Sequence, residues 1–287
     1  MSGKRNLYSE FVTEIADILK KGGIEDALAE SHFITEYLTG VPYPVFLAGM
    51  GEFDMGSLSK KAEEICQRRV SGEPLQYIFG EWDFFGMTFK VGKGVLIPRP
   101  DTEILAEEAI NLRKGFPNTK YADICSGSGC VGAAVARHVK NVCGFAVEKS
   151  EDAFLYLKEN LAVHAPEICP CLEDALLPET AAKYTELDLI TANPPYLTKK
   201  DMAELQREVT YEPSLALFGG DDGLMFYREL TRIWKNSLKA GGYILFEAGM
   251  GQHTDVMEIL RENGFCDIRT APDLAGIERV VIGRKER

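Results

Sequence analysis

The spacing of apolar residues divides the chain into a first part with a helical period and a longer part in which strands and helices alternate. Near the N-terminus, Phe11, Ile15 and Leu19 recur four positions apart, and a pair of glycines separates them from a second apolar series. A third series covers residues 57–70. Such spacing is typical of amphipathic helices. It predicts a small helical bundle over residues 1–74.

The pattern changes after Pro74, where aromatic and β-branched residues with intervening glycines replace the helical period. This composition is typical of strands joined by tight turns. We therefore expect residues 75–97 to form a connecting β-hairpin, with Tyr77-Ile78-Phe79 as a strand.

From residue 98 onward, short apolar segments alternate with helical ones. The expected strands include residues 121–124, 142–147, 187–191, 242–247 and 277–283. Alternation of this kind is typical of a mostly parallel sheet with helices on both faces. We therefore expect residues 98–287 to form one α/β domain.

Charge and composition narrow the classes of partner and site. The chain has 287 residues with 32 basic and 44 acidic side chains, a formal net charge of −12. An acidic protein is poorly suited to neutralising phosphates, so we expect no direct binding of nucleic acid. No segment has the ~18 apolar residues of a membrane span, and no signal peptide is recognisable. Seven irregularly spaced cysteines favour a reduced cytoplasmic location, and their spacing predicts no metal site.

A glycine-rich turn follows the strand that ends near residue 124. Its residues are Cys125, Ser126, Gly127, Ser128 and Gly129. Glycines at a strand-to-helix turn let the backbone approach a ligand closely, and the helix offers free N–H groups. Glu148 ends the next strand, where a carboxylate can accept hydrogen bonds from ribose hydroxyls. These features predict an adenosine cofactor and are compatible with both NAD and S-adenosylmethionine.

A second turn, Asn193-Pro194-Pro195-Tyr196, follows another expected strand. Two consecutive prolines stiffen it and leave bare carbonyl groups. The Asn193 side-chain oxygen and the Pro194 carbonyl can each accept a hydrogen bond from an –NH₂ group, and the Tyr196 ring can pack on a planar group. The turn predicts a substrate amino group held by these four residues, with Asn193, Pro194 and Tyr196 catalytic.

Together the two turns resemble those of amino-group methyltransferases that use S-adenosylmethionine. The wider chain is similar to the PrmC/HemK family of peptide chain release factor glutamine methyltransferases. The blocks that carry this resemblance are residues 74–80, 84–86, 96–103, 193–196, 211–213, 216–224 and 275–281.

The resemblance implies a Rossmann-like, seven-stranded class I methyltransferase fold behind the helical domain, which would help recognise the substrate. It implies that Cys125–Gly129 and Asn193 contact S-adenosylmethionine, that Glu148 holds its ribose, and that Asp174 and Ala175 lie by its adenine. The implied substrate is the glutamine of the Gly-Gly-Gln motif in class I release factors, methylated on its side-chain nitrogen.

At three of these positions the chain departs from the family pattern. The family commonly has Gly where this chain has Cys125, Asp where it has Glu148, and a larger residue where it has Ala175. Glu148 keeps the carboxylate, and Cys125 is compatible with cofactor binding if its side chain points away from the cofactor.

The expected mechanism depends on positioning, since the four histidines fall outside these motifs and no dedicated base is recognisable. The main alternative is methylation of an exocyclic amino group on a nucleic-acid base, for which similar turns also serve. A third possible function, that of a nicotinamide-dependent dehydrogenase, would leave the Asn-Pro-Pro-Tyr turn without a role. A fourth, that of a non-catalytic adaptor for release factors, would leave both the glycine-rich turn and the Asn-Pro-Pro-Tyr turn without a role.

Overall fold

The computed structural model describes residues 2–47 and 55–286, which divide into two compact units. The helical unit comprises the chain up to Gly80 together with Arg207–Tyr211. The sheet unit comprises Glu81–Gln206 and the chain from Glu212 onward. The chain therefore passes from one unit to the other three times, and the division lies at Gly80 rather than at the expected residue 74.

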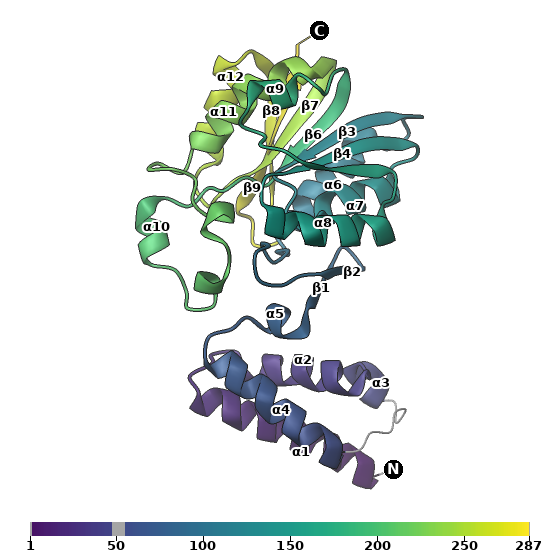
Figure 1. Cartoon of the computed structure of the whole chain (residues 1–287), viewed down its shortest axis with the longest axis vertical. Helices are drawn as coiled ribbons and strands as arrows, with labels where there is room; N and C mark the ends of the chain where they lie inside the picture. Colours follow the sequence, from purple (N-terminus) through teal and green to yellow (C-terminus); the bar gives the residue numbers. More distant parts are fainter. Residues whose placement is uncertain (1, 48–54, 287) are drawn as a thin grey trace. The chain divides into compact units, whose positions relative to one another are not determined.

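The helical unit is built around an apolar core to which several of its helices contribute. Its helices are α1 (Ser2–Lys21), α2 (Ala27–Thr39), α3 (Tyr43–Leu47), α4 (Met55–Val70) and α5 (Leu75–Phe79) (Figure 1). Phe11, Ile15 and Leu19 of α1 are buried together with Ile34 of α2 and Ile65 of α4. The predicted helical period of α1 is therefore the period of its buried face. Residues 48–54 of the predicted bundle lie outside the described residues.

Helix α5 replaces the strand expected at Tyr77-Ile78-Phe79. Pro74 is extended and precedes the helix, and Gly80 ends it in the left-handed conformation with φ 77°. Leu75 and Ile78 are both buried in the core of the helical unit. Residues three apart share a face in a helix but point to opposite faces in a strand, so burial of both favours the helix over the local β propensity.

The expected hairpin is formed by β1 (Glu81–Phe84) and β2 (Met87–Lys90), which pair antiparallel. Phe85 and Gly86 connect the strands with φ of 51° and 70°, as a two-residue hairpin of type I′ requires. The hairpin packs into the sheet unit, where Phe84 and Phe89 are buried in its core.

The sheet unit is centred on a seven-stranded sheet. In chain order its strands are β3 (Thr119–Ile124), β4 (Val142–Glu148), β5 (Ile168–Leu172), β6 (Leu187–Ala192), β7 (Leu238–Glu247), β8 (Phe265–Pro272) and β9 (Glu278–Lys285). Their order across the sheet is β5-β4-β3-β6-β7-β9-β8. The first five strands in this order are parallel, and β9 pairs antiparallel with both β7 and β8. The predicted mostly parallel sheet is confirmed.

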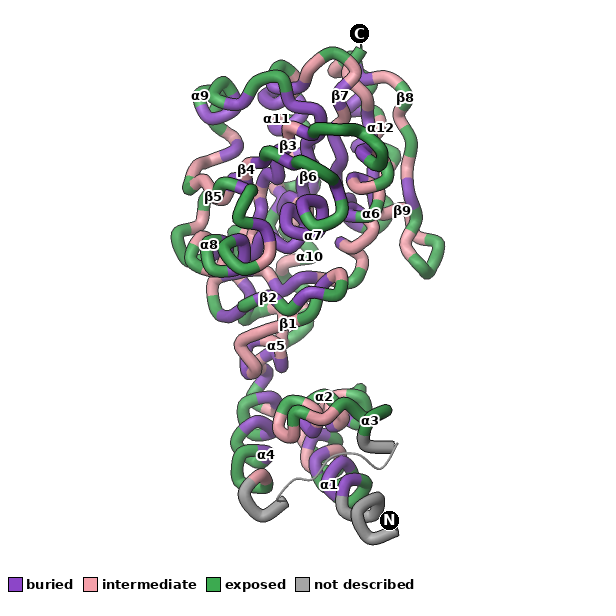
Figure 2. Tube along the Cα trace, turned by 90° about the vertical axis from the view of Figure 1, so that its right-hand side faces the viewer, coloured by how far each residue is buried: buried purple, intermediate pink, exposed green. Residues whose placement is uncertain are grey.

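Helices cover both faces of this sheet. The longer ones are α6 (Thr102–Arg113), α7 (Cys130–His138) and α8 (Glu151–His164) on one face, and α11 (Met225–Trp234) and α12 (His253–Glu262) on the other (Figure 1). Side chains alternate between the two cores: Tyr121 and Leu189 face α6–α8, whereas Ala122 and Ile190 face α11 and α12. The central strands β3 and β6 are therefore buried on both faces, and they are purple along most of their length in Figure 2.

The strand order brings two distant turns together. From β3 the chain continues to β4 and β5 on one side, and then returns to β6 and β7 on the other. Open α/β sheets bind ligands at the carboxyl ends of the strands where the order reverses. Ile124 at the end of β3 pairs with Ala192 at the end of β6, so the turns that begin at Cys125 and Asn193 start side by side.

Within the described ranges, no helix has both the length and the apolar character that crossing a membrane requires.

Candidate active site

The glycine-rich turn between β3 and α7 has a backbone conformation that few residues adopt easily. Cys125, Gly127 and Gly129 all have left-handed φ, at 59°, 53° and 82°. Gly127 has open space where a Cβ would lie, whereas a Cβ on Gly129 would come within 2.6 Å of Leu157. The left-handed φ at residue 125 explains why glycine suits this position. The Cys125 side chain packs against the core on the α11 side.

Glu148 connects this turn to the end of β4. Its carboxylate accepts the backbone N–H of Gly127 at 2.8 Å through one oxygen. The other oxygen accepts the N–H groups of Lys149 at 2.9 Å and Ser150 at 2.8 Å. Burial raises the pKa of the Glu148 carboxyl, and the three N–H donors act in the opposite direction. The hydrogen bonds therefore hold the carboxylate in place before any ligand arrives.

Asp174 and Ala175 follow β5 on the same side of the turn. The Asp174 carboxylate accepts the N–H of Leu176 at 2.9 Å and pairs with the Lys149 ammonium at 2.7 Å. Ala175 is buried, and its carbonyl accepts the indole N–H of Trp234 at 2.9 Å. The backbone after β5 is thus fixed by contacts on both sides.

These residues surround a cavity that encloses about 760 Å³ of empty space, part of it open to solvent. Its lining comprises Gly94, Leu96, Cys125, Gly127, Val147, Glu148, Lys149, Ser150, Ala153, Glu173, Asp174, Ala175, Leu176, Asn193, Pro195, Pro213, Leu215, Ala216 and Phe226. Mostly apolar walls with a few carboxylates suit a nucleoside, whose base is flat and whose ribose carries hydroxyl donors. The residues present therefore fit an adenosine cofactor.

A second, smaller cavity of about 400 Å³ adjoins the first. The two share Leu96, Cys125, Gly127 and Asn193 in their linings. Asn193 therefore stands where the two spaces meet.

The side chain of Asn193 is oriented by residues from two other elements. Its Nδ2 donates to Thr102 Oγ1 at 3.2 Å, and Thr102 is the first residue of α6. The Glu247 carboxyl, at the end of β7, accepts hydrogen bonds from the side chains of both Thr102 and Asn193. Because the –NH₂ group faces these two partners, the Asn193 side-chain oxygen remains available as an acceptor.

The rest of the turn is held by its backbone. The Tyr196 carbonyl accepts Gln252 Nε2 at 3.0 Å, and Leu197 exchanges hydrogen bonds of 2.8 Å with Leu217 and Gly219. Burial and the nearby Glu247 charge raise the pKa of Tyr196 to about 12, so its phenol stays protonated at neutral pH. The turn is a rigid platform rather than a flexible loop.

Two buried carboxyl groups lie below the turns. Thr191 donates to Asp123 Oδ1 at 2.7 Å, while Asp123 Oδ2 and Glu247 Oε2 have no hydrogen-bond partner. Burial raises the pKa of Asp123 to about 7 and that of Glu247 to about 7. Both groups therefore titrate near neutrality.

The structure separates the predicted site residues into those that line the cavities and those that support them. Residues 125 and 127, Glu148, Asp174, Ala175, Asn193 and Pro195 line the larger cavity, and Ser126 and Ser128 line the smaller one. Gly129 is the N-cap residue that immediately precedes α7 and is not part of either lining. Pro194 and Tyr196 are not part of either lining, and Tyr196 packs against the core on the α11 side.

Sequence reasoning missed several residues of the site. Thr102 and Glu247 orient Asn193, and Phe226, Pro213 and Leu215 line the larger cavity. Thr102 and Pro213 lie in blocks that carried the family resemblance, which was the available signal. Among the described residues, no group of three or more His, Cys, Asp or Glu side chains is arranged to hold a metal ion.

Two family models match the chain. The PrmC N-terminal domain matches residues 10–80, and the family described as conserved hypothetical protein 95 matches residues 83–232.

Two solved structures with a similar fold are methyltransferases. A methyltransferase from Pyrococcus furiosus covers 80% of this chain and 100% of its own, with a TM-score of 0.52 and 15% identity. A 16S rRNA methyltransferase of T. thermophilus, in complex with AdoMet and guanosine, covers 72% of this chain and 50% of its own, with a TM-score of 0.51 and 18% identity. The sheet unit has the class I methyltransferase fold, as predicted.

Three curated relatives that align with nearly the whole chain have the same name. The release factor glutamine methyltransferase of Geobacter sulfurreducens is 41% identical, over 93% of this chain and 92% of its own length. That of Clostridium acetobutylicum is 34% identical, over 92% and 94%. That of Fusobacterium nucleatum is 36% identical, over 94% and 76%. Identity of 34–41% over at least 92% of this chain and at least 76% of each relative shows that the chain belongs to the release factor glutamine methyltransferase family.

Proposed function

We propose that the protein transfers a methyl group from S-adenosylmethionine to the side-chain amide nitrogen, N5, of the glutamine in the Gly-Gly-Gln motif of class I release factors. The observation that carries this proposal is the position of Asn193. It lies where the two cavities meet, with its –NH₂ group held by Thr102 and Glu247 and its oxygen free to accept. An acceptor beside a cavity whose lining suits a nucleoside is well placed to present an N–H group to a methyl donor.

In this proposal S-adenosylmethionine supplies an electrophilic methyl group. Glu148 holds the ribose hydroxyls, and Asp174 and Ala175 border the adenine. The turn from Cys125 to Gly129 presents its backbone to the rest of the cofactor, next to Asn193. The preformed hydrogen bonds of Glu148 support this assignment, because a carboxylate that is already oriented loses little freedom on binding.

An amide nitrogen is a weak nucleophile, since its lone pair is shared with the carbonyl. We assign its two N–H groups to the Asn193 side-chain oxygen and the Pro194 carbonyl, which orient the lone pair toward the methyl group. Orientation of this kind can lower a barrier by up to about 7–11 kcal/mol in the most favourable cases. Pro195 completes the wall of the cavity, and Tyr196 supports the turn through its contact with Gln252.

The partner in this reaction is the release factor itself, so the enzyme works in the cytoplasm and needs no direct contact with nucleic acid. The net charge of −12 is consistent with a protein substrate.

The decisive experiment incubates the protein with methyl-labelled S-adenosylmethionine and a class I release factor. We expect label on the wild-type factor and none on a factor whose Gly-Gly-Gln glutamine is changed to alanine. No label on the wild-type factor would contradict the proposal. Label on DNA or RNA instead would favour methylation of a nucleic-acid base.

The role of Asn193 has its own test. Asn193→Ala should lower kcat by at least about 100-fold, since it removes the acceptor that orients the substrate amide. The exposed Asn236 offers a matched control, and Asn236→Ala should keep wild-type kcat. Circular dichroism would verify that both variants are folded. Near-normal turnover of a folded Asn193→Ala variant would remove this residue from its assigned role.

A further inference from the structure

A short segment downstream of the Asn-Pro-Pro-Tyr turn belongs to the helical unit. The chain leaves the sheet unit after Gln206, contributes Arg207–Tyr211 to the helical unit, and returns at Glu212. The last three residues of this segment form the 3₁₀ turn η1 (Val209–Tyr211). Neither the proposed chemistry nor the hydrophobic cores account for this excursion.

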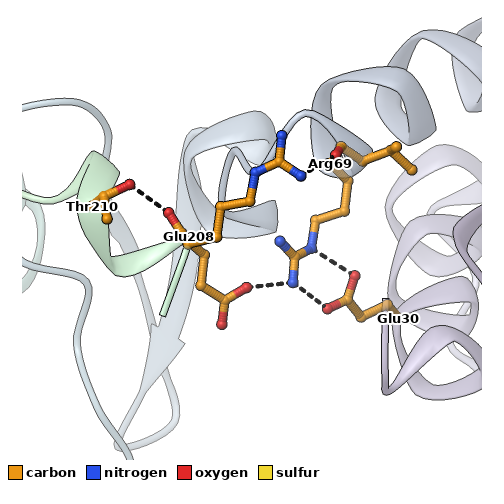
Figure 3. Close-up of polar contacts among 6 residues, drawn as sticks. Glu30, Arg69, Glu208 and Thr210 are labelled. Carbon is orange, nitrogen blue, oxygen red and sulfur yellow. Dashed lines mark hydrogen bonds and ion pairs between the residues drawn. The ribbon is translucent and has the colours of Figure 1, made fainter. Parts of the chain in front are cut away.

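The segment is anchored by a largely buried ion pair on α4. The Arg69 side chain is 9% exposed, and its guanidinium donates to both oxygens of Glu30 at 2.8 Å. The same guanidinium also pairs with Glu208 of the segment (Figure 3). Arg69 is thus shared between a carboxylate of α2 and one that lies 139 positions away in the sequence. A bidentate guanidinium pair of this kind has a well-defined geometry.

Neighbouring contacts bind the same segment to the end of α4. Arg207 donates to the Val70 carbonyl at 3.0 Å, and the Tyr211 hydroxyl donates to the Ser71 carbonyl at 3.1 Å. A cationic side chain that bonds the last carbonyls of a helix complements the helix dipole. The segment is therefore held at three of its five residues.

On its far side the segment continues directly into the wall of the larger cavity. Glu212 is buried in the sheet unit, where it pairs with Arg99 and accepts the Ile97 N–H at 3.1 Å. Pro213 and Leu215, one and three residues later, line the cavity. A single residue, Glu212, separates the anchored Tyr211 from Pro213, the first residue of this wall.

We propose that Arg69 is a positioning residue for cofactor binding. By holding Glu208 it restrains Arg207–Tyr211, and through the continuous chain it restrains the wall formed by Pro213 and Leu215. The helical unit thereby contributes to the affinity of the site, in addition to any contact with the release factor. This inference rests on the proposed use of S-adenosylmethionine.

The test changes Glu208, the partner of Arg69 in the segment Arg207–Tyr211, and leaves Arg69 itself unchanged. Arg69→Met would leave Glu30 without its partner and can unfold the helical unit. Glu208→Gln keeps the pair between Arg69 and Glu30, and the Glu208 side chain is partly exposed. Glu204→Gln is the matched control, because Glu204 is exposed in the same loop and lies outside the anchored segment.

We expect Glu208→Gln to raise the Kd for S-adenosylmethionine about three- to fivefold in titration calorimetry, a size suited to a partly exposed pair. The KM for the cofactor should rise by a similar factor while kcat at saturating cofactor is retained. Glu204→Gln should match the wild type. A purely structural role for the anchor would leave Kd and KM unchanged.

The possible outcomes are distinct. Equal Kd values for Glu208→Gln, Glu204→Gln and the wild type would overturn the inference and leave the proposed function intact. A wild-type protein that does not bind S-adenosylmethionine would contradict the proposed function, and the inference with it. A folded Glu208→Gln variant with weakened cofactor binding supports both.

Discussion

The orientation of Asn193 depends on two residues from other elements, and Thr102 allows that dependence to be tested. Thr102→Val keeps the side-chain shape but removes the hydroxyl that accepts Asn193 Nδ2 and bonds Glu247. An amide free to rotate presents its oxygen to the substrate less often, so we expect kcat to fall about 10- to 100-fold. Steady-state kinetics would measure the change. Thr102→Ser, which keeps the hydroxyl, should retain most activity, and wild-type kcat in the valine variant would contradict the role assigned to Thr102.

The buried carboxyl of Asp123 predicts a particular dependence of stability on pH. Burial raises the pKa of Asp123 to about 7 in the folded protein, whereas the pKa of an aspartate in the unfolded chain is near 3.8. Between these values the folded state binds more protons than the unfolded state, so this group lowers the free energy of unfolding as pH rises from about 4 to about 7. Asp123→Asn removes the titration and should flatten that decline.

Urea unfolding at several pH values would measure this effect. The stability of Asp123→Asn relative to the wild type should improve steadily across the window and then level off above pH ~7. A difference in stability that is constant with pH would show that Asp123 does not titrate there.

At the scale of elements, the Asn-Pro-Pro-Tyr turn depends on a glycine in the segment packed beside it. A Cβ on Gly219 would lie 2.6 Å from Tyr196 Cα and 2.7 Å from the Pro195 carbonyl oxygen, and both are backbone atoms that cannot move aside cheaply. Gly219→Ala should therefore destabilise the protein by roughly 1–3 kcal/mol and lower kcat by shifting the turn.

The control for this change is Gly132→Ala. A Cβ at Gly132, inside α7, would meet Asp123 at 3.6 Å, an ordinary contact. Alanine is also the better helix former, by about 0.8–1.0 kcal/mol. Thermal unfolding should place Gly132→Ala at or above the wild type and Gly219→Ala below it. The reverse order would mean that the turn can adapt to a side chain at residue 219.

Local sequence patterns predicted the elements that bury a regular face and missed those that depend on distant partners. Strand β6 is buried on both faces and four of its six residues are apolar, and this strand signal located the turn at Asn193. Strand β8 was not predicted. It lies at the edge of the sheet, where Asp267 and Arg269 give it a polar face and interrupt the apolar pattern. Tyr77 has a high β propensity, but the burial of both Leu75 and Ile78 favours a helix at this position.

The candidate site divides in the same way. Each turn is a contiguous motif and could be found from sequence. The hydrogen bond from Asn193 to Thr102 joins residues 91 positions apart, and that from Arg69 to Glu208 joins residues 139 positions apart. Such pairs form only when the whole chain has folded, so the local spacing of apolar and polar residues cannot predict them.

At the scale of the whole molecule, the chain forms two units, each with its own apolar core or cores, and it passes from one unit to the other three times. The core of the helical unit is separate from the two cores that flank the sheet. Both tryptophans, Trp82 and Trp234, lie in the sheet unit. Tryptophan fluorescence therefore follows unfolding of the sheet unit alone, and hydrogen exchange in α1 and α4 follows the helical unit.

This division predicts how a bound cofactor changes stability. At a concentration 100 times its Kd, S-adenosylmethionine should stabilise the sheet unit by about 2.7 kcal/mol and raise the temperature at which tryptophan emission changes. Binding free energies are reciprocal: if the Arg69 anchor strengthens cofactor binding, then the cofactor must strengthen the helical unit by the same coupling free energy.

Hydrogen exchange would measure this coupling. When the cofactor binds, the amides of α1 and α4 should gain protection from exchange, but less than those of β3 and β6. Glu208→Gln should abolish the gain in the helical unit and preserve most of the gain in the sheet unit. Equal protection of both units in the wild type would instead indicate a single cooperative unit, and no protection of α1 and α4 would show that the anchor transmits nothing.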